Sequence, residues 1–292
     1  MSGLLVKPRR GAADGVVHHI TPQSAGWTYV GFDVLALAPG QAAARDTDGR
    51  EVCLVFLSGR GRVEAGGTDF GTLGERNSPF EGSPWSVYVP AHARWQVTAE
   101  TPVELAVCSA PATGKLPARV IPPSEVGQET RGKGTNTRHV RNILPVGKDA
   151  ESLLVVEVIT PGGNWSSYPP HKHDEASATE AVLEEIYYFE IDNAGREGEG
   201  LAYQRVYGSS RLRHIDVCCE VANGDVILIP FGYHGPSMAA PGYDLYYLNV
   251  MAGPGERMWR FCDDPAHSWI RGTWAGQEID PRLPLTSPAG RR

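Results

Sequence analysis

The sequence lacks three features that would each define a class of protein: long apolar runs, paired cysteines and a basic cluster. No segment approaches the roughly 20 consecutive apolar residues that a membrane-spanning helix needs. The five cysteines are odd in number and show no C-x-x-C spacing, so neither a disulfide framework nor a thiolate zinc site is indicated. We expect all five to be buried as small apolar residues.

The charge balance excludes further classes. Lys and Arg number 27 against 34 Asp and Glu, which gives a net charge of −7. Because the net charge is negative and no basic run is present, we expect no binding to nucleic acid or to an anionic membrane. The first residues also lack the apolar stretch of a signal peptide, so we expect a cytoplasmic location.

Glycine and proline, by contrast, are abundant, with 34 and 23 residues. So much turn chemistry argues against a helix bundle and favours many short strands, which predicts an all-β chain. Residues 27–112 contain six short β-rich segments, and a similar pattern starts again after residue 150. We therefore predict two tandem β-barrel-like halves, residues 1–112 and 137–292, joined by a Pro- and Gly-rich linker at 113–136.

The clearest turn signal is Ala222-Asn223-Gly224, which lies between two apolar runs. Asn-Gly favours a tight hairpin turn because both residues tolerate a positive φ. We expect the flanking segments, Arg213–Val221 and Asp225–Ile229, to pair with each other as a hairpin.

The segment Tyr168–Asp174 holds the most informative residues. In an extended chain, residues two apart point to the same side, so His171 and His173 can present their imidazoles together. The two prolines before them keep the chain extended and out of a helix. Two imidazoles at this spacing suit a divalent metal such as Zn²⁺, Mn²⁺, Fe²⁺ or Ni²⁺, although H-x-H alone is equally typical of a surface loop.

Two later segments strengthen the metal interpretation. A strand-like run begins with the carboxylates of Glu184 and Glu185, and a third imidazole, His234, follows the apolar strand that ends at Pro230. This order of His-x-His, Glu and His resembles the two motifs of the cupin superfamily. The resemblance implies two small jelly-roll barrels with few short helices, and one metal held by His171, His173, Glu185 and His234.

The carboxylate is the least certain ligand in this comparison. Cupins place it directly before the strand residues, which favours Glu185 and keeps Glu184 as the alternative. Eleven residues separate His173 from Glu185, more than cupins usually have. The first half has no histidine in the equivalent segment and offers only His92 later, so we predict a metal-free N-terminal barrel.

The whole chain is similar to the 5-deoxy-glucuronate isomerases of bacterial myo-inositol catabolism. The resemblance rests on several segments of the second half: Arg131–Gly134, Arg138–Pro145, Tyr168–Asp174, Glu184–Phe189, His234–Tyr247, Asn249–Pro254 and Trp269–Trp274. It implies an aldose–ketose isomerisation of 5-deoxy-D-glucuronate to 2-deoxy-5-keto-D-gluconate. A divalent metal, Zn²⁺ first with Mn²⁺, Fe²⁺ or Ni²⁺ as alternatives, would then act as a Lewis acid.

A uronate substrate needs a cation for its carboxylate and a group that moves a proton. Arginine provides a bidentate fork, so the predicted substrate contacts are Arg138, Arg141 and Arg257. Lys172 is the weakest cation candidate, because strand alternation turns it away from His171 and His173. For catalysis we predict Asp174, Tyr187 and Arg141, with Glu175 as an alternative base.

Three other functions stay open. The related 4-deoxy-5-keto-uronate isomerases of pectin breakdown share the metal pattern, and some cupins are metal-dependent dioxygenases. A non-catalytic sugar-binding protein with two barrels is the third alternative, because a fold does not determine a function. The exposed strand edges of small barrels also make a homo-oligomer an expectation.

Overall fold

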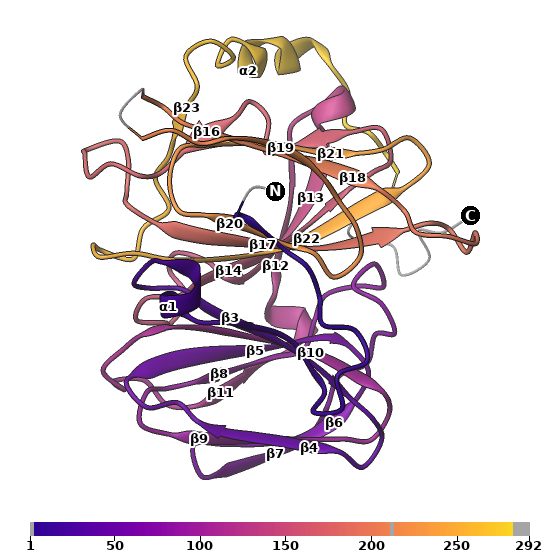
Figure 1. Ribbon diagram of the computed structural model, residues 1–292, viewed down its shortest axis with the longest axis vertical. Coiled ribbons are helices and arrows are strands. Elements are labelled where there is room, and N and C mark those ends of the chain that lie inside the picture. The colour runs from indigo at the N-terminus through magenta and orange to yellow at the C-terminus, as the bar shows by residue number, and fades with distance from the viewer. Residues whose placement is uncertain (1–2, 211–212, 283–292) are drawn as a thin grey trace.

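The structure is a computed structural model that describes residues 3–210 and 213–282, and its regular secondary structure is mostly β-strand (Figure 1). Within the described residues, the α-helices are the short α1 (Pro22–Ala25) and α2 (Ile270–Thr273). Three single turns of 3-10 helix complete the helical content: η1 (Pro123–Glu125), η2 (Gly134–Asn136) and η3 (Trp274–Gly276). The prediction of an all-β chain with few short helices is confirmed.

The first half of the chain forms two antiparallel sheets. Its strands are β2 (Val16–Ile20), β3 (Gly31–Leu37), β4 (Ala42–Asp46), β5 (Arg50–Ser58), β6 (Gly61–Ala65), β7 (Thr68–Leu73), β8 (Ser86–Val89), β9 (Arg94–Ala99), β10 (Val103–Pro111) and β11 (Arg119–Ile121). The six-stranded sheet has the order β11-β8-β5-β10-β3-β2, and the four-stranded sheet has the order β4-β9-β6-β7. We call this pair of sheets the N-terminal module.

The second half repeats the arrangement with larger sheets. Its strands are β12 (Gly127–Arg131), β13 (Arg138–Leu144), β14 (Leu154–Thr160), β15 (Trp165–Ser166), β16 (His171–Lys172), β17 (Glu184–Asp192), β18 (Ala202–Tyr207), β19 (Asp216–Val221), β20 (Val226–Ile229), β21 (Tyr233–Ala239), β22 (Asp244–Ala252) and β23 (Cys262–Asp263). Together with β1 (Leu5–Val6) they form a sheet of order β1-β20-β17-β22-β14-β13-β12 and a second one of order β19-β18-β21-β16-β23, in which β15 pairs with β21. We call this pair the C-terminal module.

The two modules stack so that the large sheet of each lies in the middle of the molecule (Figure 1). Three apolar clusters fill the spaces between the four sheets. The middle cluster joins the modules, because it combines Phe32 and Tyr88 of the first half with Tyr188 and Tyr246 of the second. The central strands are consequently buried on both faces, and every residue of β14 is buried, the charged Glu157 included.

Some pairings cross between the two halves of the sequence. The N-terminal strand β1 pairs with β20 of the C-terminal module, with Leu5 opposite Ile227. Within the segment expected to be a linker, β11 joins the N-terminal sheet and β12 joins the C-terminal sheet. The predicted boundaries at residues 112 and 136 stay a prediction, and residues 1–2 and 283–292 lie outside the described residues.

The predicted hairpin at Ala222–Gly224 is wrong. Strand β19 pairs with β18, whereas β20 pairs with β17 and β1, so the turn carries the chain from one sheet to the other. Its backbone is held by β17, because the Gly224 N–H donates to the Phe189 carbonyl at 2.8 Å and the Asn223 side chain accepts from the Ile191 N–H. Asn-Gly provides the positive φ of Gly224 (78°) without pairing the strands.

The expectation that every cysteine is buried is also wrong. Cys53 and Cys108 are buried between the modules, but Cys218 is exposed, and Cys219 and Cys262 are half-buried. Two of these residues belong to β19, which lies at the edge of its sheet, where few neighbours cover it. None of the helices in the described part of the chain is long and apolar enough to span a membrane.

Candidate metal centre and the adjoining pocket

Three histidines of the C-terminal module form a buried cluster. His171 on β16 lies directly opposite His234 on β21, and the ring centroids of these residues are 4.4 Å apart. The ring of His173 lies 4.7 Å from that of His234. One ring nitrogen of each histidine lies within 4.8 Å of those of the other two. The extended His-x-His segment and the strand after Pro230 thus lie side by side, which brings the three histidines close enough to bind one metal ion.

The Glu185 carboxylate lies beside this cluster. Its Oε2 is 3.0 Å from Nε2 of His173 and 3.0 Å from Nε2 of His234. Glu185 is buried, which alone would raise its pKa, but the contacts with His173 and His234 lower the pKa overall. The carboxylate is therefore ionised and available as a ligand.

Backbone carbonyls orient two of the imidazoles. His173 Nδ1 lies 3.1 Å from the Leu183 carbonyl, and His234 Nδ1 lies 3.3 Å from the Gly232 carbonyl. A carbonyl only accepts hydrogen bonds, so Nδ1 carries the proton on both rings and Nε2 is directed toward Glu185. Metal-binding histidines are typically oriented in this way by the hydrogen bond of their other nitrogen.

These contacts provide a test of whether a cation fits the site. The Nε2 atoms of His173 and His234 face the Glu185 carboxylate at 3.0 Å, and although burial alone would lower the pKa of His173, contact with this carboxylate raises it. The three groups therefore favour a positive charge between them. The contact of His234 lacks hydrogen-bond geometry, which leaves its buried Nε2 without a hydrogen-bond partner. Burial and the neighbouring histidines hold the pKa of His171 well below its ordinary value, so that ring is neutral. Three imidazoles and one carboxylate therefore fit a divalent cation.

The alternative ligand Glu184 lies elsewhere. Its carboxylate accepts hydrogen bonds from the backbone N–H groups of Thr28, Tyr29 and Val30 at 2.7, 2.7 and 3.0 Å. These residues belong to the N-terminal module, so Glu184 connects the two modules. Alternation along β17 separates the two neighbouring carboxylates.

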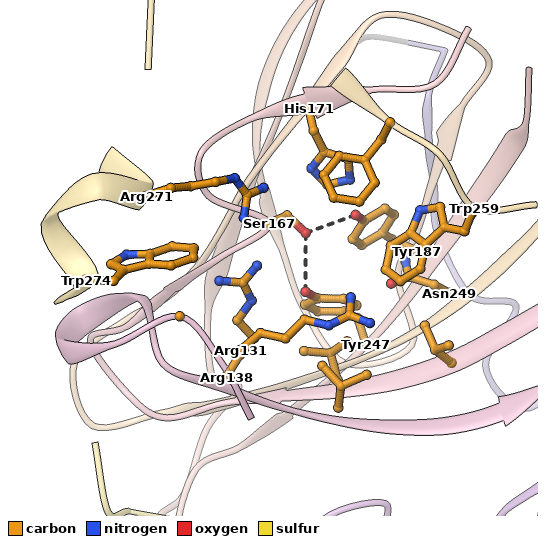
Figure 2. Close-up of a pocket in the computed structure, with 15 residues that line it drawn as sticks. Arg131, Arg138, Ser167, His171, Tyr187, Tyr247, Asn249, Trp259, Arg271 and Trp274 are labelled. Atoms are coloured by element: carbon orange, nitrogen blue, oxygen red, sulfur yellow. Dashed lines mark hydrogen bonds between the residues drawn. The ribbon is translucent and has the colours of Figure 1, made fainter. Parts of the chain in front are cut away.

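A cavity of about 380 Å³ lies against His171. It is lined by Arg131, Gly132, Arg138, Val140, Val156, Val158, Ser167, His171, Tyr187, Tyr247, Asn249, Trp259, Phe261, Arg271 and Trp274. Ser167 contacts two of the tyrosine hydroxyls, Tyr187 at 3.0 Å and Tyr247 at 3.3 Å (Figure 2). The mixture of aromatic walls, hydroxyls and guanidiniums is typical of a site for a small polar anion.

The structure brings some predicted catalytic and substrate-binding residues to this cavity and places others away from it. Tyr187 and Arg138 line it. Asp174 does not; its carboxylate lies 2.9 Å from the Lys172 ammonium and accepts from the Gly232 N–H at 2.9 Å. Glu175 is exposed and pairs with Lys172 at 3.3 Å.

Two predicted arginines are structural in their contacts. Arg141 donates to Glu157 and to the Pro79 carbonyl, both at 2.8 Å, between the modules. Arg257 donates to four backbone carbonyls at 2.6–2.9 Å, those of Leu144, Pro145, Lys148 and Leu153. Neither of them lines the cavity, because their donors are committed to other parts of the fold.

Several lining residues were not predicted as site residues: Arg131, Ser167, Asn249, Trp259, Arg271 and Trp274. Arg131 lies in the expected linker, and Arg271 and Trp274 lie in the helical segment near the end of the described chain. No local pattern indicates that these segments meet over the cavity. The strands of the sheet bring Arg131 there, because β12 pairs with β13 and places Arg131 opposite Arg138.

Residues 4–270 match the KduI/IolB family. The chain belongs to this family. Among curated KduI/IolB relatives, the "5-deoxy-glucuronate isomerase" of Geobacillus kaustophilus is 50% identical over 272 residues, which cover 92% of this chain and 96% of the relative. The protein of the same name from Bacillus subtilis is 44% identical over 276 residues, which cover 92% and 99% of the two chains.

Solved structures confirm the fold of this KduI/IolB chain. The crystal structure of an IolB-like protein from Salmonella typhimurium has a TM-score of 0.86 and 49% identity, and the match covers 92% of this chain and 99% of the other. An oxalate decarboxylase from Lactobacillus farciminis has a TM-score of 0.62 at 12% identity and coverages of 90% and 89%, a likeness of fold alone. The predicted cupin architecture is thereby confirmed.

Proposed function

We propose that the protein is an aldose–ketose isomerase that converts 5-deoxy-D-glucuronate to 2-deoxy-5-keto-D-gluconate in myo-inositol catabolism. The observation that supports this most strongly is the 50% identity to a 5-deoxy-glucuronate isomerase over nearly the full length of both chains. The pocket agrees with this choice, because it combines hydroxyls and guanidiniums in one cavity that is also lined by His171, one of the clustered histidines. The names of the relatives favour this reaction over a dioxygenase and over a sugar-binding protein without activity.

A single divalent cation bound by His171, His173, Glu185 and His234 is part of the proposal. Zn²⁺ is the first choice, and Mn²⁺, Fe²⁺ and Ni²⁺ are alternatives, since imidazole and carboxylate ligands suit all four. When bound, the cation would supply Lewis-acid polarisation of a substrate carbonyl oxygen.

The protein's own residues must move a proton between two neighbouring carbons. Among the predicted proton-transfer groups, Tyr187, Asp174 and Glu175, the Tyr187 hydroxyl is the best placed, because Tyr187 lines the cavity and Ser167 contacts its hydroxyl at 3.0 Å. Asp174 does not line the cavity, and its carboxylate is held by the Lys172 ammonium and the Gly232 N–H. We therefore propose that Asp174 stabilises the loop that follows His173. Val140, Val156 and Val158 form an apolar wall that excludes water from the reacting carbons.

The decisive experiment is proton NMR of metal-loaded protein with 5-deoxy-D-glucuronate in D₂O, with the metal content measured on the same sample. Conversion to the keto acid supports the proposal. Deuterium on the hydroxymethyl carbon of the product (C6 of the keto acid, which was the aldehyde carbon C1 of the substrate) indicates proton transfer through solvent-exchangeable groups. Its absence indicates a hydride shift or a shielded proton transfer.

The alternatives are tested in the same series. If a metal-loaded sample does not convert this substrate, the 4-deoxy-5-keto-uronate is tried next, and failure with both overturns the isomerase proposal. Oxygen uptake would then indicate a dioxygenase, and binding without turnover would indicate a sugar-binding protein. The cytoplasmic location and the homo-oligomer stay predictions.

A further inference from the structure

Three guanidiniums line the cavity, but only two of them are paired with carboxylates among the described residues. Arg131 lies 2.5 Å from Glu129, and Arg271 makes two contacts with the Asp263 carboxylate. These two arginines are therefore electrically compensated inside the protein.

Arg138 is different. Its side chain is buried, with 8% of the residue exposed, and within the described part of the chain it forms no ion pair with a carboxylate. Its one hydrogen bond there runs from Nη1 to the Asn136 carbonyl at 3.2 Å. Burial, with the neighbouring Arg131 and Arg271 adding to it, lowers the pKa of Arg138 to about 10, so the guanidinium is still charged at neutral pH.

An uncompensated buried cation is unusual because removal of a charge from water is costly unless a counter-ion replaces the lost hydration. The three guanidiniums carry three positive charges, and the carboxylates of Glu129 and Asp263 neutralise two of them, so a net charge of +1 remains at this end of the cavity. A monoanionic ligand would restore neutrality. Small polar neutral molecules would not.

The position of Arg138 fits a ligand that also reaches the histidine cluster. The guanidinium lies near the Trp274 ring, with 5.9 Å from Cζ to the ring centroid. In Figure 2, Arg138 and Arg131 lie on the opposite side of Ser167 from His171. A short sugar acid can thus place its carboxylate at one end of the cavity and its reacting carbons at the other.

We propose that Arg138 binds the carboxylate of the sugar acid and thereby selects monoanionic substrates over neutral sugars of the same size. This inference rests on the proposed function, since it concerns the same cavity. The planar guanidinium can bind both carboxylate oxygens, which a lysine ammonium cannot do with the same geometry. The Trp274 ring of η3 lies near both the Arg138 and the Arg271 guanidiniums, so it shields Arg138 from water on that side.

The test compares two substrates that differ only at C6: 5-deoxy-D-glucuronate and the neutral 5-deoxy-D-glucose. For Arg138→Met we expect kcat/KM on the uronate to fall about 100- to 1,000-fold, while the rate on the neutral sugar changes by less than about threefold. Arg138→Lys should lie between the wild type and Arg138→Met, because it keeps the charge but loses the fork. Arg205→Met is the matched control, because Arg205 pairs with Asp216 outside the cavity.

A structural role for Arg138 predicts a different pattern. It would lower the thermal midpoint and reduce the activity on both substrates equally. Our inference predicts a midpoint for Arg138→Met that is no lower than that of the wild type, because an unpaired buried charge is removed. Equal losses on both substrates, or an unchanged preference for the uronate, would overturn the inference.

A binding experiment separates failure of this inference from failure of the proposed function. If the wild type does not isomerise the uronate, the proposed function fails, and the binding of D-glucuronate and D-glucose is measured by calorimetry. Binding of D-glucuronate that is lost in Arg138→Met still supports a carboxylate site. Binding that is absent, or that Arg138→Met leaves unchanged, overturns it.

Discussion

The carboxylates of Glu184 and Glu185 point to opposite faces of β17, one toward the N-terminal module and the other toward the histidine cluster. Glu184 accepts three backbone hydrogen bonds from Thr28, Tyr29 and Val30 of the N-terminal module. Glu185 lies 3.0 Å from the Nε2 atoms of both His173 and His234. One strand therefore connects the modules through one residue and completes the candidate metal site through the next.

This arrangement predicts different effects for two chemically identical substitutions. Glu185→Gln should lower the metal affinity by more than the roughly 10- to 100-fold that loss of an outer partner costs, and activity should fall with it. Glu184→Gln should keep the metal but lower the free energy of unfolding by about 1.5–3 kcal/mol, because it weakens charged hydrogen bonds between the modules. Mass spectrometry measures the metal content, and chemical denaturation measures the free energy of unfolding. If Glu184→Gln lost the metal and Glu185→Gln kept it, Glu184 rather than Glu185 would be the metal ligand.

Arg141 provides a second contrast, because it was predicted to contact the substrate and instead contacts Glu157. The Glu157 carboxylate is buried and also accepts from Arg76 of the N-terminal module at 2.8 and 3.0 Å. The two arginines on either side lower the pKa of Glu157 despite its burial. This group of charges is therefore an ionic connection between the modules.

We expect Glu157→Gln to cost about 3–5 kcal/mol in the free energy of unfolding, since it leaves two buried guanidiniums without their counter-ion. Arg141→Met should also lower the thermal midpoint, while the KM for the sugar acid changes by less than about twofold. The opposite pattern is expected for Arg138→Met, which makes the two variants controls for each other. A large rise in KM without loss of stability in Arg141→Met would instead support the predicted substrate role of Arg141.

The sequence predicted the histidine cluster because its signal is local: two residues of an extended segment and one residue after an apolar strand. The arginines have no such signal. Arg138 and Arg141 lie three residues apart on β13 and therefore on opposite faces, but the sequence does not say which face borders the cavity. That depends on the stacking of the modules, which is a tertiary property.

The pairing of β19 also depends on tertiary structure. The residues Ala222–Gly224 favour a hairpin turn, but in the structure they connect strands of two different sheets. Arg271 and Trp274 reach the cavity from a segment whose chain position gives no indication of it. Local chemistry therefore predicted the fold class and the proximity of the candidate metal ligands. The substrate end of the site required the three-dimensional arrangement.

A third prediction concerns Glu190 and Glu104, which meet at the Tyr188 hydroxyl between the modules. Tyr188 contacts Glu104 at 3.0 Å and also Glu190. A hydroxyl has only one proton to donate, so both contacts are hydrogen bonds only when one carboxyl holds a proton. Burial and the nearby Glu104 raise the pKa of Glu190 to about 8, against an ordinary 4.5.

The native state therefore holds a proton that the unfolded state releases above about pH 4.5. Its contribution to stability is complete below that pH and is lost as the pH rises toward 8. We expect the stability difference between the wild type and Glu190→Gln to change by on the order of 2–4 kcal/mol between pH 5 and pH 8. Denaturation curves at several pH values measure it, and a difference that does not vary with pH would contradict the shared proton.

The last prediction separates the two proton-transfer candidates, Tyr187 and Asp174. Tyr187→Phe keeps the ring between Phe189 and Tyr247 but removes the hydroxyl that Ser167 holds in the cavity. We expect kcat to fall by about 10²- to 10⁴-fold, the usual contribution of a general acid or base, with the metal content unchanged. Asp174→Asn should weaken the contacts with Lys172 and the Gly232 N–H, so it should lower stability more than kcat. Steady-state rates and metal analysis of both variants decide between the two residues. If Tyr187→Phe kept the full rate while Asp174→Asn was folded, metal-loaded and inactive, Asp174 would be the proton-transfer group.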